Sequence, residues 1–192
     1  LSGALCLSAG VGCGTETTEE ALTPVRLNEV VHSVFYAPQY VAQELGFFEE
    51  EGLDVSVAVG NGADKSMTAL LSDSADIALL GTEAGLYVYA EGKADYPKTF
   101  AQLTQRAGNF LVSRKEEPDF QWSDLKGKSV IGGRLGGMPE MVLEYVIKEN
   151  GMTIGKDMEI INNIDFTSTA GAFLGEVGDY TVEFEPAATT LE

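Results

Sequence analysis

The sequence predicts an α/β fold with a parallel or mixed sheet, on the basis of its alternating elements and its composition. From Val25 onward, short apolar and β-branched runs bounded by turn residues alternate with stretches whose apolar residues recur at helical spacing. This alternation is typical of βαβ units. Hydrophobic residues make up 44% and charged residues 22% of the 192 positions, close to globular averages. The chain can therefore form a core, and its length allows one domain or one domain and part of another.

The first half of the body is predicted to contain three strand–helix units. Strands are expected over residues 25–31, 55–59 and 77–80. Pro38 lies in the first turn of the first helix, where its missing N–H costs nothing, and Gly46 ends that helix. The segment EEEGLD is expected to be an acidic turn, and apolar residues at helical spacing from Ala63 mark a second helix. The third helix begins at Thr82, a candidate N-cap, with Glu83 placed favourably for the helix dipole.

The second half departs from this alternation and then resumes it. Strands expected near residues 99–105 and 110–114 interrupt the pattern, as a crossover between two lobes would. A new βα unit follows, with a strand over 129–132 and a helix over 138–150. The remaining expected elements are one turn of helix in WSDLKGK, strands over 158–161 and 180–184, a short helix over 168–174, and a helix from Pro186. Because that last helix starts so close to Glu192, the second lobe is expected to be incomplete.

The N-terminal segment is typical of an export signal. Its first fourteen residues, LSGALCLSAGVGCG, carry no charge and precede the polar, acidic stretch TETTEEALTP. This run is too short to span a bilayer, which takes about 20 residues, but it matches the apolar and cleavage regions of a secretion signal. Cys13 lies where a bacterial lipoprotein signal places its lipidated cysteine, although Gly10 replaces the usual leucine. An ordinary leader with an incidental cysteine is the alternative.

Charge and cysteine usage exclude several classes of function. With 30 acidic against 12 basic residues, the net charge of −18 disfavours binding to nucleic acid or to anionic lipid headgroups. Both cysteines, Cys6 and Cys13, lie in the leader. The body is therefore expected to hold no disulfide, no thiol nucleophile and no cysteine-based metal site.

The loops that follow the expected strands are the candidate ligand positions. Parallel strands present their carboxyl ends, and the N-termini of the following helices, at one edge of the sheet. Here those loops are HSVFYA, GNGAD, GTE and GRLGG, whose glycines alternatively serve only to make tight turns. The segment GGRLGGMP lacks the Lys-Ser/Thr of a phosphate loop and the spacing of a dinucleotide fingerprint, so no nucleotide is expected.

Two residues in these loops have both a functional and an ordinary interpretation. Arg134 can bind a carboxylate, sulfonate or phosphate through two hydrogen bonds or stack on a ring, or it is a solvent-exposed charge. His32 is the single histidine, which argues against a histidine-cluster metal site. It can stack on or hydrogen-bond a ligand, or it is a satisfied boundary histidine. No Gly-x-Ser-x-Gly elbow accompanies it, so no catalytic residue is assigned.

At this point the order of motifs resembles a known family. The runs RLNEVVHSVFYAPQYVAQELGFFEEEGLDVSV, GNGADKSMTALLSDSADIALLGTEA, KGKSVIGGRLGGMPEMVLEYVIKENGM and GDYTVEFEPAAT are similar to substrate-binding proteins of bacterial ABC importers. The group includes nitrate-, sulfonate-, taurine- and thiamine-precursor-binding proteins. The resemblance implies a two-lobed, periplasmic-binding-protein-like α/β fold of type II with mixed sheets, whose second lobe is truncated at the C-terminus here. The expected divisions are a leader and linker at 1–23, a first lobe at 24–107, and a crossover with an incomplete second lobe at 108–192.

The resemblance also implies a site and a set of partners. By position, the cleft between the lobes would receive His32, Tyr36, Asn61, Gly81, Thr82, Glu83, Arg106, Asn109, Arg134, Gly136, Met138 and Glu185. The expected ligand is a small organic solute, either a ring-bearing, partly cationic molecule such as a thiamine-pyrimidine precursor or an anionic sulfonate. No cofactor or metal is expected. The implied partner is an ABC permease, and a lipid on Cys13 would hold the protein outside the cytoplasmic membrane.

An enzyme of the same fold is the alternative. The resemblance extends to pyrimidine-precursor synthases, which use a histidine, a pyridoxal cofactor and a cysteine-rich iron site. His32 could serve as that histidine, and Lys65 is a conceivable Schiff-base lysine. The cysteine cluster is absent from the body, so the solute-binding hypothesis is favoured.

Overall fold

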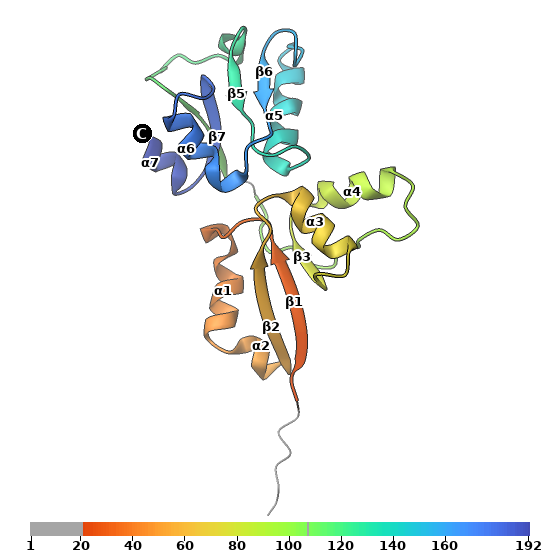
Figure 1. The fold of residues 1–192 in the computed structure, drawn as a ribbon. Coiled ribbons are helices and arrows are strands. Elements are labelled where there is room, and N and C mark those ends of the chain that lie inside the picture. The colour runs from red at the N-terminus through yellow and green to blue at the C-terminus, as the bar shows by residue number, and fades with distance from the viewer. Residues whose placement is uncertain (1–20, 107) are drawn as a thin grey trace, which may run out of the picture.

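Two β-sheets flanked by helices divide the chain into two lobes (Figure 1). The computed structural model describes residues 21–106 and 108–192. We call residues 21–106 lobe I and residues 108–192 lobe II. The leader with Cys6 and Cys13 lies outside the described residues, so lipidation stays a prediction. Each helix in the described ranges is too short or insufficiently apolar to span a bilayer.

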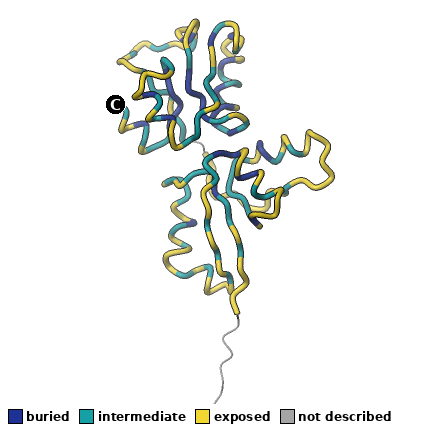
Figure 2. The backbone as a smooth tube through the Cα atoms, in the orientation of Figure 1, coloured by how far each residue is buried: buried dark blue, intermediate teal, exposed yellow. Residues whose placement is uncertain are grey.

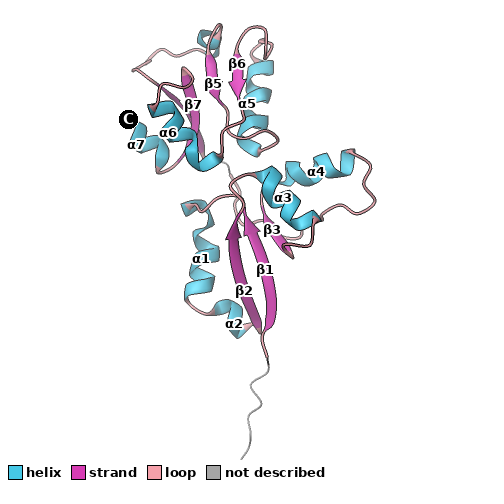
Figure 3. Ribbon diagram, in the orientation of Figure 1, coloured by secondary structure: helices cyan, strands magenta, loops and turns pink. Residues whose placement is uncertain are grey.

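Lobe I is built on a three-stranded parallel sheet. Its strands, in the order β2-β1-β3 across the sheet, are β2 (Leu53–Val59), β1 (Thr23–Glu29) and β3 (Ile77–Leu79). The helices are α1 (Ala37–Glu44), α2 (Phe47–Glu50), α3 (Ala63–Leu71) and α4 (Thr82–Ala90), with a 3-10 turn at Val34–Tyr36. Because the strands are parallel, their carboxyl ends share one edge, and that edge faces lobe II (Figure 3).

Lobe II is built on a four-stranded mixed sheet. Its strands, in the order β4-β7-β5-β6, are β4 (Asn109–Ser113), β7 (Tyr180–Phe184), β5 (Ser129–Ile131) and β6 (Glu159–Ile161). β4 is antiparallel to β7, whereas β5 is parallel to both of its neighbours. The helices are α5 (Met138–Glu149), α6 (Thr169–Leu174) and α7 (Ala187–Leu191), with 3-10 turns at Trp122–Leu125 and Phe166–Ser168. The mixed sheet expected from the sequence is therefore confirmed.

Buried residues concentrate in lobe II (Figure 2). Its core joins strand and helix residues around Val130 and Ile147, which are both fully buried. Phe120 and Trp122 pack edge to face, 5.5 Å apart, against this core. The apolar spacing of α5, which presents Leu143 and Ile147 on one face, explains why that helix docks on the sheet.

Three details of the sequence prediction are wrong. Residues 99–105 form no strand, because neither sheet offers this segment a partner for ladder hydrogen bonds. The segment EEEGLD is not a simple turn, since its first residues belong to α2, which packs against β2. Gly81, not Thr82, is the N-cap of α4. Gly81 has an extended backbone, so Thr82 is the first helical residue. Because glycine has no side chain, α4 has no side-chain cap.

A candidate solute-binding cavity between the lobes

A cavity of about 490 Å³ lies between the two lobes. Lobe I contributes the loops after β1, β2 and β3 and the segment 99–106, and lobe II contributes the loop before α5 together with Phe166 and Phe184. Since the carboxyl ends of the parallel strands meet at the edge facing lobe II, the topology itself gathers these loops. The volume is that of a pocket for a small organic molecule.

The cavity brings together part of the set that the sequence predicted. The predicted residues that line it are Tyr36, Gly81, Thr82, Glu83, Arg106, Arg134 and Met138. His32 and Glu185 instead line a second cavity of about 460 Å³. Asn61, Asn109 and Gly136 are among the lining residues of neither cavity.

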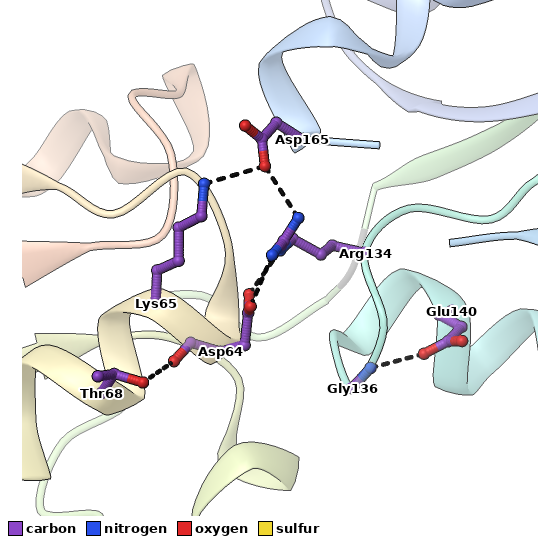
Figure 4. A network of polar contacts seen from close by, with 7 residues as sticks. All are labelled: Asp64, Lys65, Thr68, Arg134, Gly136, Glu140 and Asp165. Atoms are coloured by element: carbon purple, nitrogen blue, oxygen red, sulfur yellow. Dashed lines mark hydrogen bonds and ion pairs between the residues drawn. The ribbon is translucent and has the colours of Figure 1, made fainter. Parts of the chain in front are cut away.

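The three predicted residues outside both cavities have structural roles. Asn61 has a φ of 59°, which fits the sharp turn between β2 and α3. Asn109 begins β4, opposite Phe184 of β7. The backbone N–H of Gly136 donates to Glu140 at 2.6 Å (Figure 4). We therefore leave these three residues out of the proposed site.

Two aromatic residues of lobe II that the sequence analysis missed, Phe166 and Phe184, line the cavity. Phe184 of lobe II packs edge to face against Phe35 of lobe I with 5.3 Å between ring centroids. Phe166 lies 5.5 Å from Phe184 on the lobe II side. Phe184 is the last residue of β7, and alternation along a strand does not predict which of its residues reach a cavity between lobes. Phe166 lies in a 3-10 turn whose position no periodicity predicts.

Four charged side chains link the lobes beside the cavity (Figure 4). Arg134 of lobe II donates from Nε and Nη2 to the two oxygens of Asp64 in lobe I, at 2.7 and 2.8 Å, and from Nη1 to Asp165 at 2.9 Å. Lys65 of lobe I donates from Nζ to the same Asp165 oxygen at 3.0 Å. We call these four residues the inter-lobe network. It connects α3 of lobe I with two loops of lobe II.

The backbone at Gly62 makes this approach possible. A Cβ at that position would lie 2.7 Å from Cδ of Arg134 and 2.6 Å from Oδ1 of Asp64, closer than real Cβ contacts. The paired charges also perturb each other. Hydrogen bonding from Arg134 holds the pKa of Asp64 below its usual value, and Asp64 raises the pKa of Arg134. Both groups are therefore charged at neutral pH, and Arg134 is bound on both sides by carboxylates.

Two other ionisable residues in the cavity have perturbed pKa values. Burial raises the pKa of Tyr36 to about 12, and the charges of Glu29, Tyr40 and Glu83 add to that rise. Its hydroxyl group therefore stays protonated and can donate a hydrogen bond. Burial also raises the pKa of Glu83, while the backbone N–H groups of Glu83 and Met138 oppose the rise.

His32 belongs to a separate group of polar residues at the second cavity. Its Nδ1 lies 3.1 Å from Oε1 of Glu29, and its ring lies over that of Tyr40 with centroids 4.3 Å apart. Glu29 is fully buried and also accepts from the Tyr40 hydroxyl at 2.8 Å. The ring of His32 is 72% exposed. His32 is thus an exposed residue that pairs with a buried carboxylate at the second cavity, and its role in ligand binding stays a prediction.

Two α/β lobes that meet over a solute-sized cavity define the periplasmic-binding-protein-like class of fold. The chain matches the family model "NMT1/THI5 like" over residues 34–185, and it therefore belongs to the NMT1/THI5-like family. This confirms the family resemblance inferred from the order of motifs.

Individual proteins are also similar to this chain. The chain is 52% identical over 174 residues to "Putative binding protein YtlA" of Bacillus subtilis (strain 168). This alignment covers 91% of this chain and 52% of YtlA. A structure from Bordetella bronchiseptica RB50 aligns with a TM-score of 0.71 and 27% identity over 88% of this chain and 53% of that one. The periplasmic nitrate-binding protein NrtA from Synechocystis PCC 6803 aligns with a TM-score of 0.67 and 20% identity over 86% of this chain and 47% of NrtA. The chain thus spans about half the length of these relatives.

Proposed function

We propose that this chain is part of an extracytoplasmic solute-binding protein of an ABC importer, which captures a small organic solute between its two lobes. The observation that carries the proposal is the cavity of about 490 Å³ between the lobes, lined by the loops at the carboxyl ends of β1, β2 and β3 and by residues of lobe II. Its size suits a solute of one ring or a short chain. The family assignment and the name of the Bacillus subtilis relative support the same function.

Capture in this fold requires the lobes to close over the solute and to open again for delivery. A hinge motion of this kind needs contacts that exist only in the closed state. The inter-lobe network and the Phe35–Phe184 contact join the two lobes, and we infer that closure forms them. We infer that the solute and these contacts together favour the closed form that a permease would recognise.

The solute is proposed to be thiamine-pyrimidine-like or sulfonate-like. A ring-bearing solute is supported by the aromatic residues Tyr36, Phe35, Phe166 and Phe184. A sulfonate would need a cation, and Arg106 and Arg134 are the basic residues that line the cavity. Lys65 donates to Asp165 within the inter-lobe network, so we do not assign it as a Schiff-base lysine of an enzyme.

Calorimetric titration of the full-length protein tests the proposed function. Pyrimidines, alkanesulfonates, nitrate and polyamines would be titrated in turn, and small-angle scattering would follow lobe closure in the presence of each one that binds. We expect micromolar or tighter binding of one class, accompanied by a smaller radius of gyration. Binding of none, or chemical turnover of any, would contradict the function.

A lipid anchor on Cys13 is proposed as the attachment to the membrane. We expect that Cys13→Ser moves the full-length protein from the membrane fraction to the soluble fraction, because a serine cannot accept the thioether-linked lipid. Immunoblots of the two fractions measure this, with Cys6→Ser as the matched control. Equal membrane retention of both variants would remove the anchor from the proposal and leave solute binding intact.

A further inference from the structure

Four glutamates are buried in the described part of the chain, and they differ in how fully their carboxylates are hydrogen-bonded. They are Glu29, Glu83, Glu140 and Glu183, each at most 5% exposed. Three of them accept hydrogen bonds at 2.5–3.1 Å from two or more neighbours. Their partners include Gln39 and Tyr40 for Glu29, Gly136 and Asn162 for Glu140, and Thr169 and Thr181 for Glu183. Only Glu83 among the four has a carboxylate oxygen, Oε1, that is buried with no hydrogen-bond partner.

Glu83 is also the one buried glutamate that lines the cavity between the lobes. It lies in the first turn of α4, and its carboxylate folds back over Gly81, where a Cβ would overlap it. The N–H of Met138, at the start of α5 in lobe II, lies near the same carboxylate. The carboxylate therefore sits between the N-termini of two helices that meet at the cavity. This is where an anionic ligand would gain most from the helix dipoles.

A buried carboxylate oxygen without a partner loses the hydrogen bonds that it had to water, so its burial lowers the stability of the folded protein. We infer that a ligand supplies the missing donor. Because Glu83 already places a carboxylate beside the two helix N-termini, an anionic ligand group at the same point would meet a buried acidic group. A ligand N–H group would instead complete the hydrogen bonding of Oε1.

The other charges of the cavity agree with this assignment. The three donor nitrogens of the Arg134 guanidinium are used by Asp64 and Asp165, so an anionic ligand would have to compete with two carboxylates. Arg106 is the other basic residue of the lining and lies on the exposed crossover segment. Tyr36, Met138 and Pro139 line the same cavity as Glu83 and offer apolar and aromatic surface, which suits a flat ring.

We propose that Glu83 determines the ligand class of this cavity, by accepting a hydrogen bond from an amino or ring N–H group of a neutral or cationic nitrogen heterocycle. The inference rests on the proposed solute-binding function and selects between its two solute classes, against the sulfonates. It also gives Gly81 a role, since any side chain there would displace the carboxylate.

A pair of probes that differ in one N–H group tests this proposal. The full-length protein would be titrated with 4-amino-5-hydroxymethyl-2-methylpyrimidine, with the same ring lacking the 4-amino group, and with ethanesulfonate. The variants are Glu83→Gln, Arg106→Gln, and Glu183→Gln as the matched buried glutamate. We expect the wild type to prefer the amino compound over its desamino analogue by about 10- to 100-fold, the range for a hydrogen bond to a charged group. Glu83→Gln should abolish most of that preference, whereas Glu183→Gln should keep it.

Three outcomes would overturn the assignment of Glu83. The first is that Glu83→Gln still prefers the amino compound as the wild type does. The second is that the wild type binds ethanesulfonate more tightly than the amino compound and that Arg106→Gln removes this binding. The third is that none of the three probes binds. The wider titration of the preceding subsection separates this failure from that of the proposed function. If another solute class binds and closes the lobes, solute binding stands and only the role of Glu83 is lost. Circular dichroism of Glu83→Gln confirms that a lost preference is not a lost fold.

Discussion

The two lobes differ in where their apolar residues lie. In lobe II, Leu125, Val130, Ile131 and Ile147 are fully buried. In lobe I, the buried hydrophobic residues are Ala63, Met67, Ala75 and Ala84, which are mostly small. Lobe I instead supplies most of the cavity lining, from three strand ends and the crossover segment. The difference indicates that lobe II contributes most of the packing stability of the described residues, while lobe I contributes most of the recognition surface.

The largest expected effect comes from truncating the core of lobe II. Ile147→Ala should lower the free energy of unfolding by about 2–5 kcal/mol, because it leaves a cavity among fully buried neighbours. Leu70→Ala in α3 of lobe I removes a side chain that is only partly buried, so a loss of roughly 1 kcal/mol is expected from the smaller buried area. Urea denaturation, with hydrogen exchange to assign the loss to a lobe, measures both. Equal losses would mean that the lobes are packed alike.

The next effect concerns how the lobes are held together. Two arginines make bidentate ion pairs, Arg134 with Asp64 between the lobes and Arg26 with Asp76 within lobe I. Arg134→Gln should weaken solute binding about fivefold, since partly exposed pairs contribute about 1 kcal/mol and we infer that lobe closure forms this pair. Arg26→Gln is the matched control and should leave affinity unchanged. If both variants bind the solute equally well, the inter-lobe network does not contribute to closure.

The sequence predicted local elements well, but it did not predict contacts between residues far apart in the chain, such as the pair of Arg134 and Asp64. Apolar periodicity and turn residues predicted nearly every strand and helix, because each element's pattern is local. Arg134 was singled out from its loop as a ligand-binding candidate, but its partner Asp64 lies 70 residues away, and no spacing rule predicts a contact between two lobes. The expected strand at 99–105 failed for the same reason, since a strand depends on a neighbour that the segment does not have. Glu83 was expected in the cleft from the family resemblance, whereas its unpartnered oxygen is a property of packing alone.

Acid should open the lobes through Asp64. Its pKa is lowered by Arg134, so closing the lobes favours the charged form. The contribution of the pair is therefore complete above the ordinary aspartate pKa and is lost as pH falls through the lowered value. Small-angle scattering of the solute-bound protein between pH 7 and pH 3 should show expansion at the acid end while circular dichroism remains native. In Asp64→Asn the radius of gyration should not depend on pH over that range. If this variant expands in acid as the wild type does, a group other than Asp64 opens the lobes.

The smallest expected effect is a gain in stability from removing the charge of Glu83. Burial raises its pKa, so folding favours the protonated form, and the carboxylate destabilises the ligand-free protein at any pH above the raised pKa. Glu83→Gln should therefore melt at or slightly above the wild-type temperature at pH 7, and this difference should vanish as pH falls through that pKa. Glu183 also has a pKa raised by burial, but Thr169 and Thr181 donate to it, so Glu183→Gln disturbs satisfied bonds and should melt lower. Calorimetric scans of the two variants at pH 7 and pH 4 measure the contrast. A lower melting temperature for Glu83→Gln at pH 7 would identify Glu83 as a structural residue of α4 and not as one held in place for a ligand.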